Sequence, residues 1–176
     1  MQLLSDRILD MSTSATLAMA AKARELRGEG KDIIGLSLGE PDFSTPDFVK
    51  EAAIQAVNDG YNSYTPVDGY GELKDAIITK FKRDNNLAYK PSQIVVSTGA
   101  KQSLFNVAGV MLNDGDEVIL PCPYWVSYAD IVKLFGGVPV EVKTSIDTDF
   151  KMTAEQLEAA ITPKTKMMWF SSPCNP

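Results

Sequence analysis

The chain has 176 residues, of which 44% are apolar and 23% are charged, and its formal net charge is −6. This composition is typical of a globular protein, and the acidic balance argues against nucleic acid or an anionic membrane as a main partner. The absence of histidine excludes His-dependent catalytic triads and His-containing metal sites within the chain.

Membrane-spanning and secretory patterns are missing from the sequence. No stretch approaches the roughly 18 consecutive apolar residues that a membrane-spanning helix needs, and the first residues lack the basic and then apolar pattern of a secretory signal. Two cysteines do not make a disulfide framework. The simplest interpretation is a protein of the reducing cytoplasm.

Helices are predicted where apolar residues recur at helical spacing between turn-forming residues. They cover residues 17–27, 46–59, 72–84, 101–112 and 125–135, and a capping box of Thr153 and Gln156 begins one more. The helix over residues 72–84 has Leu73, Ala76, Ile77 and Phe81 on its expected buried face. The helix over residues 101–112 is apolar on nearly all sides, so it needs cover from several directions.

Strands are predicted from the short apolar runs that lie between these helices. They cover residues 33–38 (a strand or an extended segment), 93–96, 117–120, 138–142 and 166–171. Strands that alternate with helices predict an α/β fold with a mainly parallel sheet and helices on both of its faces.

The stretch from Gln93 to Leu104 is the first candidate for a binding site. An apolar run breaks at the small residues Ser97-Thr98-Gly99-Ala100 and continues into a helix. The backbone N–H groups and the positive end of the helix dipole suit a phosphate group, and Lys101 adds a cation in the first turn. The alternative is an ordinary strand–helix turn that contains a glycine.

Four further motifs stand in a defined order around this turn. The five motifs are Gly39-Glu40-Pro41-Asp42, Tyr64-Thr65-Pro66-x-x-Gly69, Ser97-Thr98-Gly99-Ala100-Lys101-Gln102, Pro123-Tyr124-Trp125 and Asn175-Pro176. In this order and spacing the chain resembles the N-terminal part of class I pyridoxal-phosphate aminotransferases, closest to the bacterial aspartate aminotransferase branch. The likeness runs from about Ser5 to the last residue.

The resemblance implies a fold, a reaction and an assembly. Residues 1–45 are expected to form an N-terminal arm and the start of a small domain, and residues 46–176 the first part of a large pyridoxal-phosphate-binding domain. The expected reaction transfers an amino group between an L-amino acid, aspartate above all, and a 2-oxo acid such as 2-oxoglutarate. A cytoplasmic homodimer is implied, and we expect the chain to be the front part of a longer protein.

The resemblance also assigns cofactor contacts. Gly99, Ala100 and Lys101 would hold the phosphate of pyridoxal 5'-phosphate. Trp125 would cover one face of the cofactor ring, since an indole stacks well on a flat pyridine. The alternative for Trp125 is a partly buried tryptophan at a helix start. Tyr64 would reach the phosphate of the neighbouring subunit's cofactor, and its alternative is a loop aromatic that packs on the surface.

Substrate contacts are implied at three positions. Asn175 would donate to the anionic ring oxygen and would also contact a substrate carboxylate, whereas a plain turn asparagine before proline is the alternative. The backbone of Gly39 would face a substrate carboxylate, which is compatible with its being a turn glycine. Trp125, which would lie against the cofactor ring, is expected to contact the substrate as well.

No catalytic residue is assigned within this chain. Lys101 is not the Schiff-base lysine, because the family places that lysine in a Ser-x-x-Lys segment, and no serine here is followed by lysine three residues later. The lysine, the acid that partners the pyridine nitrogen and the arginines that bind substrate are all expected beyond Pro176.

One departure from the family pattern and two alternatives bear on function. Relatives that act on acidic substrates often carry a Lys-Pro-Ser-Ala-Thr segment, whereas residues 12–16 here are Ser-Thr-Ser-Ala-Thr. A contact to the distal carboxylate is therefore in question. The alternative functions are another pyridoxal-phosphate reaction, such as a C–S lyase or related synthase, and a ligand-sensing domain of a regulator.

The last expectation concerns backbone geometry. The resemblance implies cis peptide bonds before Pro123 and Pro176. A cis bond before proline costs only about 0.5–1 kcal/mol over trans.

Overall fold

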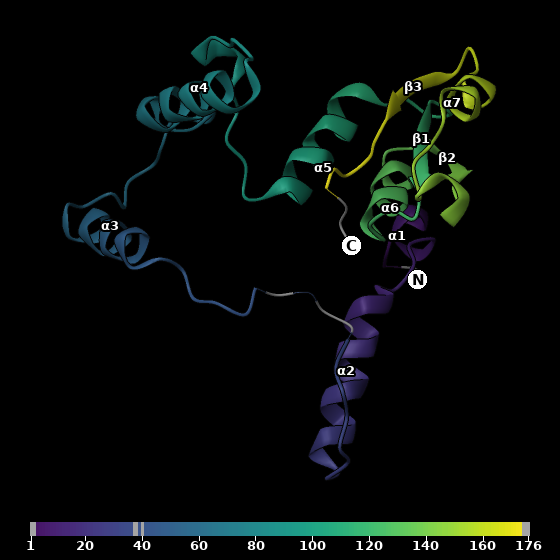
Figure 1. Ribbon diagram of the computed structural model, residues 1–176, viewed down its shortest axis with the longest axis horizontal. Coiled ribbons are helices and arrows are strands. Elements are labelled where there is room, and N and C mark those ends of the chain that lie inside the picture. Colours follow the sequence, from purple (N-terminus) through teal and green to yellow (C-terminus); the bar gives the residue numbers. More distant parts are fainter. Residues whose placement is uncertain (1–2, 37–38, 40, 174–176) are drawn as a thin grey trace. The chain divides into compact units, whose positions relative to one another are not determined.

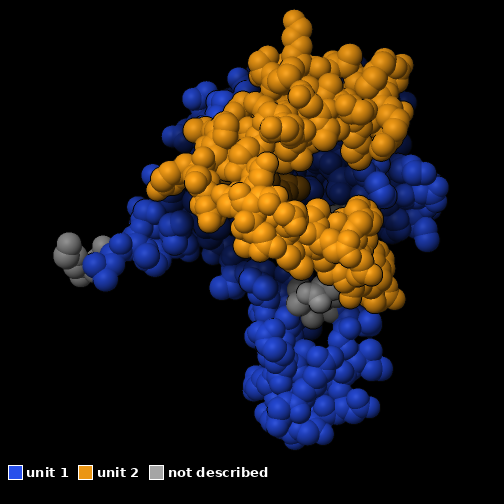
Figure 2. Space-filling view, turned by 90° about the vertical axis from the view of Figure 1, so that its left-hand side faces the viewer, with its two compact units in different colours: residues 1–39, 103–176 blue, residues 40–102 orange. Residues whose placement is uncertain are grey.

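The computed structural model describes residues 3–36, 39 and 41–173. The chain divides into two compact units, coloured in Figure 2. Unit 1 comprises residues 1–39 and 103–176, and unit 2 comprises residues 40–102. Each unit is described by itself.

Helices and strands alternate along the second half of the chain, as the sequence predicts (Figure 1). The helices are α1 Asp6–Leu9, α2 Ala15–Gly28, α3 Asp47–Asn58, α4 Gly71–Asn85, α5 Ala100–Met111, α6 Ser127–Leu134 and α7 Ala154–Ala160. The strands are β1 Glu117–Cys122, β2 Val138–Lys143 and β3 Thr165–Met168, and the two 3₁₀ turns are η1 Pro91–Gln93 and η2 Ile146–Thr148.

A parallel sheet organises unit 1. Its three strands lie in the order β2-β1-β3, and both pairings are parallel, which confirms the predicted α/β fold. The pairing of β1 with β2 runs without interruption from Glu117↔Val138 to Cys122↔Lys143. Helix α6 packs on β1 and β2, and α7 contacts β2.

The core of unit 1 lies on the central strand. Val118 and Leu120 are fully buried and point to one face, since side chains alternate along a strand. They belong to one cluster with Ala108, Leu112, Ile131, Val132 and Trp169. Ile119 points to the other face and is buried as well. Burial on both faces explains why this strand is an unbroken Val-Ile-Leu run.

Helix ends follow from local capping patterns of the side chains or the backbone. The predicted capping box is confirmed, because the Gln156 N–H donates to Thr153 Oγ1 at 3.2 Å and the Thr153 N–H donates to Gln156 Oε1 at 3.0 Å. The helix predicted over residues 72–84 is confirmed as α4, and Asn86 caps its end in the left-handed conformation with φ of 54°.

The strand predicted over residues 93–96 is wrong. Gln93 closes η1, and the backbone of Ile94 is extended but joins no ladder among the described residues. The Val96 N–H donates to the Asp68 carbonyl oxygen at 3.1 Å instead. An apolar β-branched run becomes a strand only beside another strand, and no described strand pairs with this one.

Two other predicted segments differ in detail. Residues 33–36 join no strand, so only the alternative of an extended segment stands there, and residues 37–38 lie outside the described part of the chain. Strand β3 covers Thr165–Met168 rather than residues 166–171. The Trp169 N–H still donates to the Ile119 carbonyl oxygen at 3.0 Å, so the chain leaves the sheet just after this residue.

The expected buried face of α4 is only partly covered. Ile77 and Phe81 are half-buried, whereas Leu73 and Ala76 are exposed. Helix α5 is similar, because Ala108 is fully buried while the Val110 side chain is 82% exposed. An apolar face is buried only where another element packs on it, and the described residues supply cover on one side.

The loop before α4 is tied to the segment before α5 within unit 2. Lys74 Nζ lies 2.5 Å from Asp68 Oδ2, and the Lys74 side chain is only 12% exposed. The hydrogen bond from Lys74 lowers the pKa of Asp68, so the carboxylate keeps its charge at neutral pH. Gly69, with φ of 98°, lies directly against the Val96 side chain.

No helix in the described ranges is both long enough and apolar enough to cross a bilayer.

Residues 1–176 expressed alone should aggregate. Large apolar side chains on α3 and α5 remain exposed, among them Phe48 at 74%, Val57 at 74% and Val110 at 82%. At about 25 cal/mol per Å², a few hundred Å² of such surface forfeits several kcal/mol, which is comparable with the whole stability of a domain. Analytical ultracentrifugation of the purified segment tests this. A monodisperse monomer that does not bind a hydrophobic dye would contradict the expectation.

Gly69→Ala should destabilise the full-length protein by about 2 kcal/mol or more. A Cβ at this position would lie 2.5 Å from Cγ2 of Val96, and φ of 98° is unfavourable for any residue with a side chain. Gly71→Ala is the matched control, because a Cβ there meets nothing within 4 Å. Thermal unfolding of both variants gives the comparison, and equal melting temperatures would refute the packing argument.

Candidate functional site

The small-residue turn lies at the N-terminus of α5. Gly99 has φ of 81°, and its N–H donates to the Ser97 carbonyl oxygen at 2.8 Å. The Thr98 N–H donates to the side-chain oxygen of Gln102, one turn into the helix. The turn is therefore held in shape by a residue of the helix that it begins.

This turn has the donors that a phosphate group needs. Ala100 and Lys101 occupy the first turn of α5, where the backbone N–H groups point toward the N-terminal end of the helix. A Cβ built on Gly99 would meet nothing within 4 Å, so the space beside the turn is open. Backbone donors, a positive helix end and the Lys101 side chain suit a dianion. The predicted turn is present, although no strand precedes it.

The loop that carries Trp125 follows the carboxyl end of β1. The Cys122–Pro123 peptide bond is cis, which confirms the expectation for this loop. The Ser172–Pro173 bond is cis too, whereas Pro176 lies outside the described residues. Trp125 is half-buried and lies two residues before α6. The tryptophan therefore sits where parallel α/β sheets bind ligands, beyond the carboxyl end of a strand.

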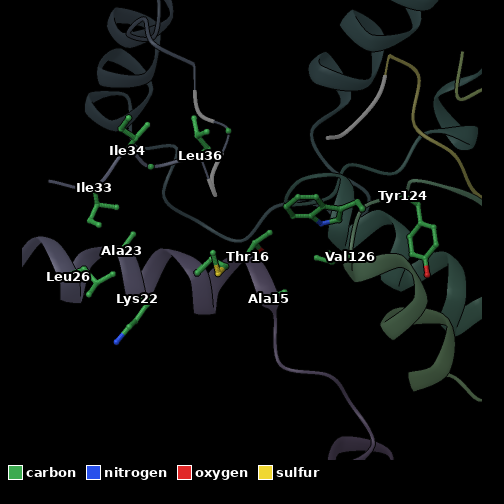
Figure 3. A pocket seen from close by; sticks show the side chains of 14 residues that line it. Ala15, Thr16, Lys22, Ala23, Leu26, Ile33, Ile34, Leu36, Tyr124 and Val126 are labelled. Carbon is green, nitrogen blue, oxygen red and sulfur yellow. The ribbon is translucent and has the colours of Figure 1, made fainter. Parts of the chain in front are cut away.

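A largely apolar hollow of about 1160 Å³ lies in unit 1 (Figure 3). Trp125 and Gly39 both line it, so the structure brings together two of the predicted substrate residues. Its other wall includes Ala15 and Thr16, which belong to the segment over residues 12–16 that the sequence already connected with substrate, and Met19, which the sequence did not assign. Figure 3 shows the Tyr124 ring at the opposite end of the hollow from Leu26 and Ile33. The apolar stripe of α2 was the available signal for that wall.

Two titratable groups beside Trp125 are kept neutral. Burial raises the pKa of the Tyr124 hydroxyl, and its hydrogen bond to Glu141 raises it further. Burial also raises the pKa of the Cys122 thiol, with the charge of Glu141 acting in the same direction. A thiol with a raised pKa is a poor nucleophile at neutral pH. This half-buried environment suits Cys122 as a packing residue.

Tyr64 projects from the loop before α4, and its side chain is fully exposed. The neighbouring aromatics of this loop pack on each other instead, with the rings of Tyr61 and Tyr70 edge to face at 5.7 Å. Surface packing within unit 2 therefore does not account for Tyr64. Its expected role, contact with a neighbouring subunit's cofactor, stays a prediction.

The remaining predicted residue is Asn175, which lies outside the described residues together with Cys174. Within the described part of the chain, no group of acidic residues and cysteines is arranged to hold a metal ion.

Comparison with known proteins extends these observations over the whole chain. The model of the family "Aminotransferase class I and II" matches residues 31–176. The chain is 55% identical to the aspartate/prephenate aminotransferase of Cereibacter sphaeroides over 176 residues, which are all of this chain and 44% of that protein. It is 51% identical to the aspartate aminotransferase of Bacillus subtilis, covering 98% of this chain and 44% of that protein.

Solved structures agree with the sequence comparisons. The fold matches the aspartate aminotransferase from Rhizobium meliloti with a TM-score of 0.95 and 48% identity, covering 99% of this chain and 44% of that one. It matches the Thermus thermophilus aspartate aminotransferase with maleate with a TM-score of 0.95 and 47% identity, covering 100% of this chain and 46% of that one.

The chain thus spans less than half the length of the relatives that it matches. The match of the family model nevertheless extends over most of its residues. The chain belongs to the family of class I and II aminotransferases.

Proposed function

We propose that the intact protein is a pyridoxal-phosphate-dependent aminotransferase that moves an amino group between L-aspartate and a 2-oxo acid such as 2-oxoglutarate. The observation that carries this proposal is the likeness of the whole chain, in sequence and in fold, to aspartate aminotransferases. One of these was solved with maleate, which has the four carbons and two carboxylates of aspartate but no amino group.

The residues of this chain fit the proposed cofactor at two places. When bound, pyridoxal phosphate supplies an electron sink for the substrate's α-carbon. Gly99, Ala100 and Lys101 bind the phosphate through the helix end and the lysine charge, for which the open side of the turn leaves room. Trp125 packs on one face of the ring, and Asn175 donates to the ring oxygen.

Substrate binding is proposed beside Trp125. The Gly39 backbone and the Asn175 amide bind the substrate carboxylate, and the Trp125 indole keeps water from the reacting carbon. Gly39 and Trp125 line one hollow, which supports this assignment. The lysine that moves the substrate proton, the pyridine-nitrogen acid and the substrate arginines are assigned to the part of the protein beyond Pro176.

The proposed assembly is a cytoplasmic homodimer. Tyr64 donates its hydroxyl to the cofactor phosphate of the neighbouring subunit, and its full exposure in unit 2 leaves it available for that contact. Residues 1–45 are assigned to the arm and the start of the small domain, and residues 46–176 to the cofactor-binding domain.

Prephenate is a second candidate amino acceptor. The relatives from Cereibacter sphaeroides and Nitrosomonas europaea, at 55% and 53% identity, are named aspartate/prephenate aminotransferases. A C–S lyase and a sensor domain are not favoured, because each relative reported above is named an aminotransferase. Residues 12–16 are Ser-Thr-Ser-Ala-Thr and lack the lysine of the Lys-Pro-Ser-Ala-Thr segment, so the acidic substrate has to be identified by assay.

The full-length protein, loaded with pyridoxal phosphate, should convert aspartate and 2-oxoglutarate into oxaloacetate and glutamate. A parallel assay with glutamate as donor and prephenate as acceptor tests the second candidate, and a thioether amino acid tests the lyase alternative. The protein freed of cofactor is the control. Release of a thiol and pyruvate from the thioether without transamination of aspartate would contradict the proposal.

Tyr64→Phe in the full-length protein should weaken binding of pyridoxal phosphate by about tenfold to a hundredfold, because a hydrogen bond to a charged acceptor is lost. Tyr61→Phe is the matched control, since Tyr61 lies in the same loop and its ring packs on Tyr70. Titration of the cofactor-free dimers measures both constants. Equal affinity of Tyr64→Phe and wild type would remove Tyr64 from the site.

A further inference from the structure

We infer that the hydrogen bond between Tyr124 and Glu141 positions Trp125 for contact with the cofactor ring. The inference rests on the proposed function and adds to it a pair of residues that act through their neighbour. Neither Tyr124 nor Glu141 is assigned to a contact with the cofactor or the substrate.

The hydroxyl of Tyr124 anchors the loop to the edge of the sheet. It donates to Glu141 Oε1 at 2.5 Å, and Glu141 lies on β2 directly beside Leu120 of β1. A second hydrogen bond lies at the start of the loop, because Thr144 Oγ1, just after β2, donates to the carbonyl oxygen of Cys122, the last residue of β1. The loop is therefore held to β2 at Tyr124, and the strand end from which it departs is held at Cys122.

The ring of Tyr124 is held as well. It stacks on the ring of Tyr128 in α6, with centroids 6.4 Å apart and planes 8° from parallel. The Tyr128 ring in turn meets the buried Trp169 edge to face at 6.1 Å. The Tyr128 N–H donates to the Trp125 carbonyl oxygen at 2.9 Å. Tyr124 thus connects the loop to both the core and β2.

The consequence concerns the residue that comes next in the chain. Fixing both ends of the Tyr124 side chain fixes the backbone from which the Trp125 indole projects, so that less freedom is lost when a ring binds. The bond persists across neutral pH, because burial raises the pKa of the Tyr124 hydroxyl and keeps it protonated. The hydrogen-bonded pair therefore holds the loop in place throughout the neutral pH range.

The affinities for two ligands, pyridoxal phosphate and inorganic phosphate, distinguish a loss of Trp125 positioning from general damage to the fold. Pyridoxal phosphate uses both the ring contact and the phosphate turn, whereas inorganic phosphate uses the turn alone. In the cofactor-free full-length protein, Tyr124→Phe should weaken the binding of pyridoxal phosphate roughly fivefold, which corresponds to the loss of one ordinary hydrogen bond. The affinity for inorganic phosphate, measured by its competition with pyridoxal phosphate, should be unchanged.

Partner variants test the pair. Glu141→Ala, at an exposed strand position, should reproduce the fivefold loss, and the double variant should lose no more than either single variant. Glu141→Gln keeps an acceptor and should restore most of the affinity. Tyr128→Phe is the matched control, since it removes a hydroxyl from the same pair of stacked rings and keeps the ring that contacts Tyr124. In a Trp125→Ala background, Tyr124→Phe should have no further effect.

Three results would overturn the inference while leaving the proposed function intact. They are unchanged cofactor affinity in both Tyr124→Phe and Glu141→Ala, equal losses for pyridoxal phosphate and inorganic phosphate, and an undiminished loss in the Trp125→Ala background. A wild-type protein that binds no pyridoxal phosphate would overturn the proposed function and this inference with it.

Discussion

Burial of β1 on both faces is the constraint on which unit 1 depends. Val118 and Leu120 face the cluster that α5 and α6 complete, and Ile119 is buried on the opposite face. With β2 and β3 paired on its two edges, this strand cannot slip by one residue without reversing every side chain. Its carboxyl end therefore delivers the Pro-Tyr-Trp loop to one fixed place, and β2 supplies the acceptor that holds the loop there.

The turn before α5 is preorganised in a different way. Its shape comes from local hydrogen bonds, from the Gly99 N–H to Ser97 and from the Thr98 N–H to the Gln102 side chain. Gly99 adopts φ of 81°, and the space beside it is open, since a Cβ built there would meet nothing within 4 Å. Rigid donors aimed at an anion need no reorganisation when the anion arrives, which is how helix ends bind phosphate well.

Local patterns were sufficient to predict most of the fold. The capping box of Thr153 and the end of α4 at Asn86 depend on neighbours within a few residues, and both are present. Strand 93–96 was wrong because strand formation depends on a partner that residue pattern cannot supply. The exposure of Leu73 has the same origin, since periodicity shows which face is apolar but not what covers it.

The candidate site likewise contains parts that local sequence patterns predict and parts that they do not. The glycine turn and the Pro-Tyr-Trp loop are short motifs, so the sequence was enough to single them out. The hollow brings Thr16 and Met19 of α2 to the loop that carries Trp125, and a hydrogen bond joins Tyr124 to Glu141, so both features unite residues far apart in the chain. No spacing rule marks such pairs, and only the folded chain shows them.

The central claim is that this chain supplies both the phosphate turn and the ring contact for pyridoxal phosphate. A crystal structure of the full-length protein with the cofactor measures this most directly. The account predicts phosphate oxygens within hydrogen-bond distance, about 3 Å, of the Ala100 and Lys101 amides. It also predicts the pyridine ring in van der Waals contact, at about 3.5–4 Å, with the Trp125 indole. A cofactor bound with its phosphate away from α5, or with its ring out of reach of Trp125, would contradict the account.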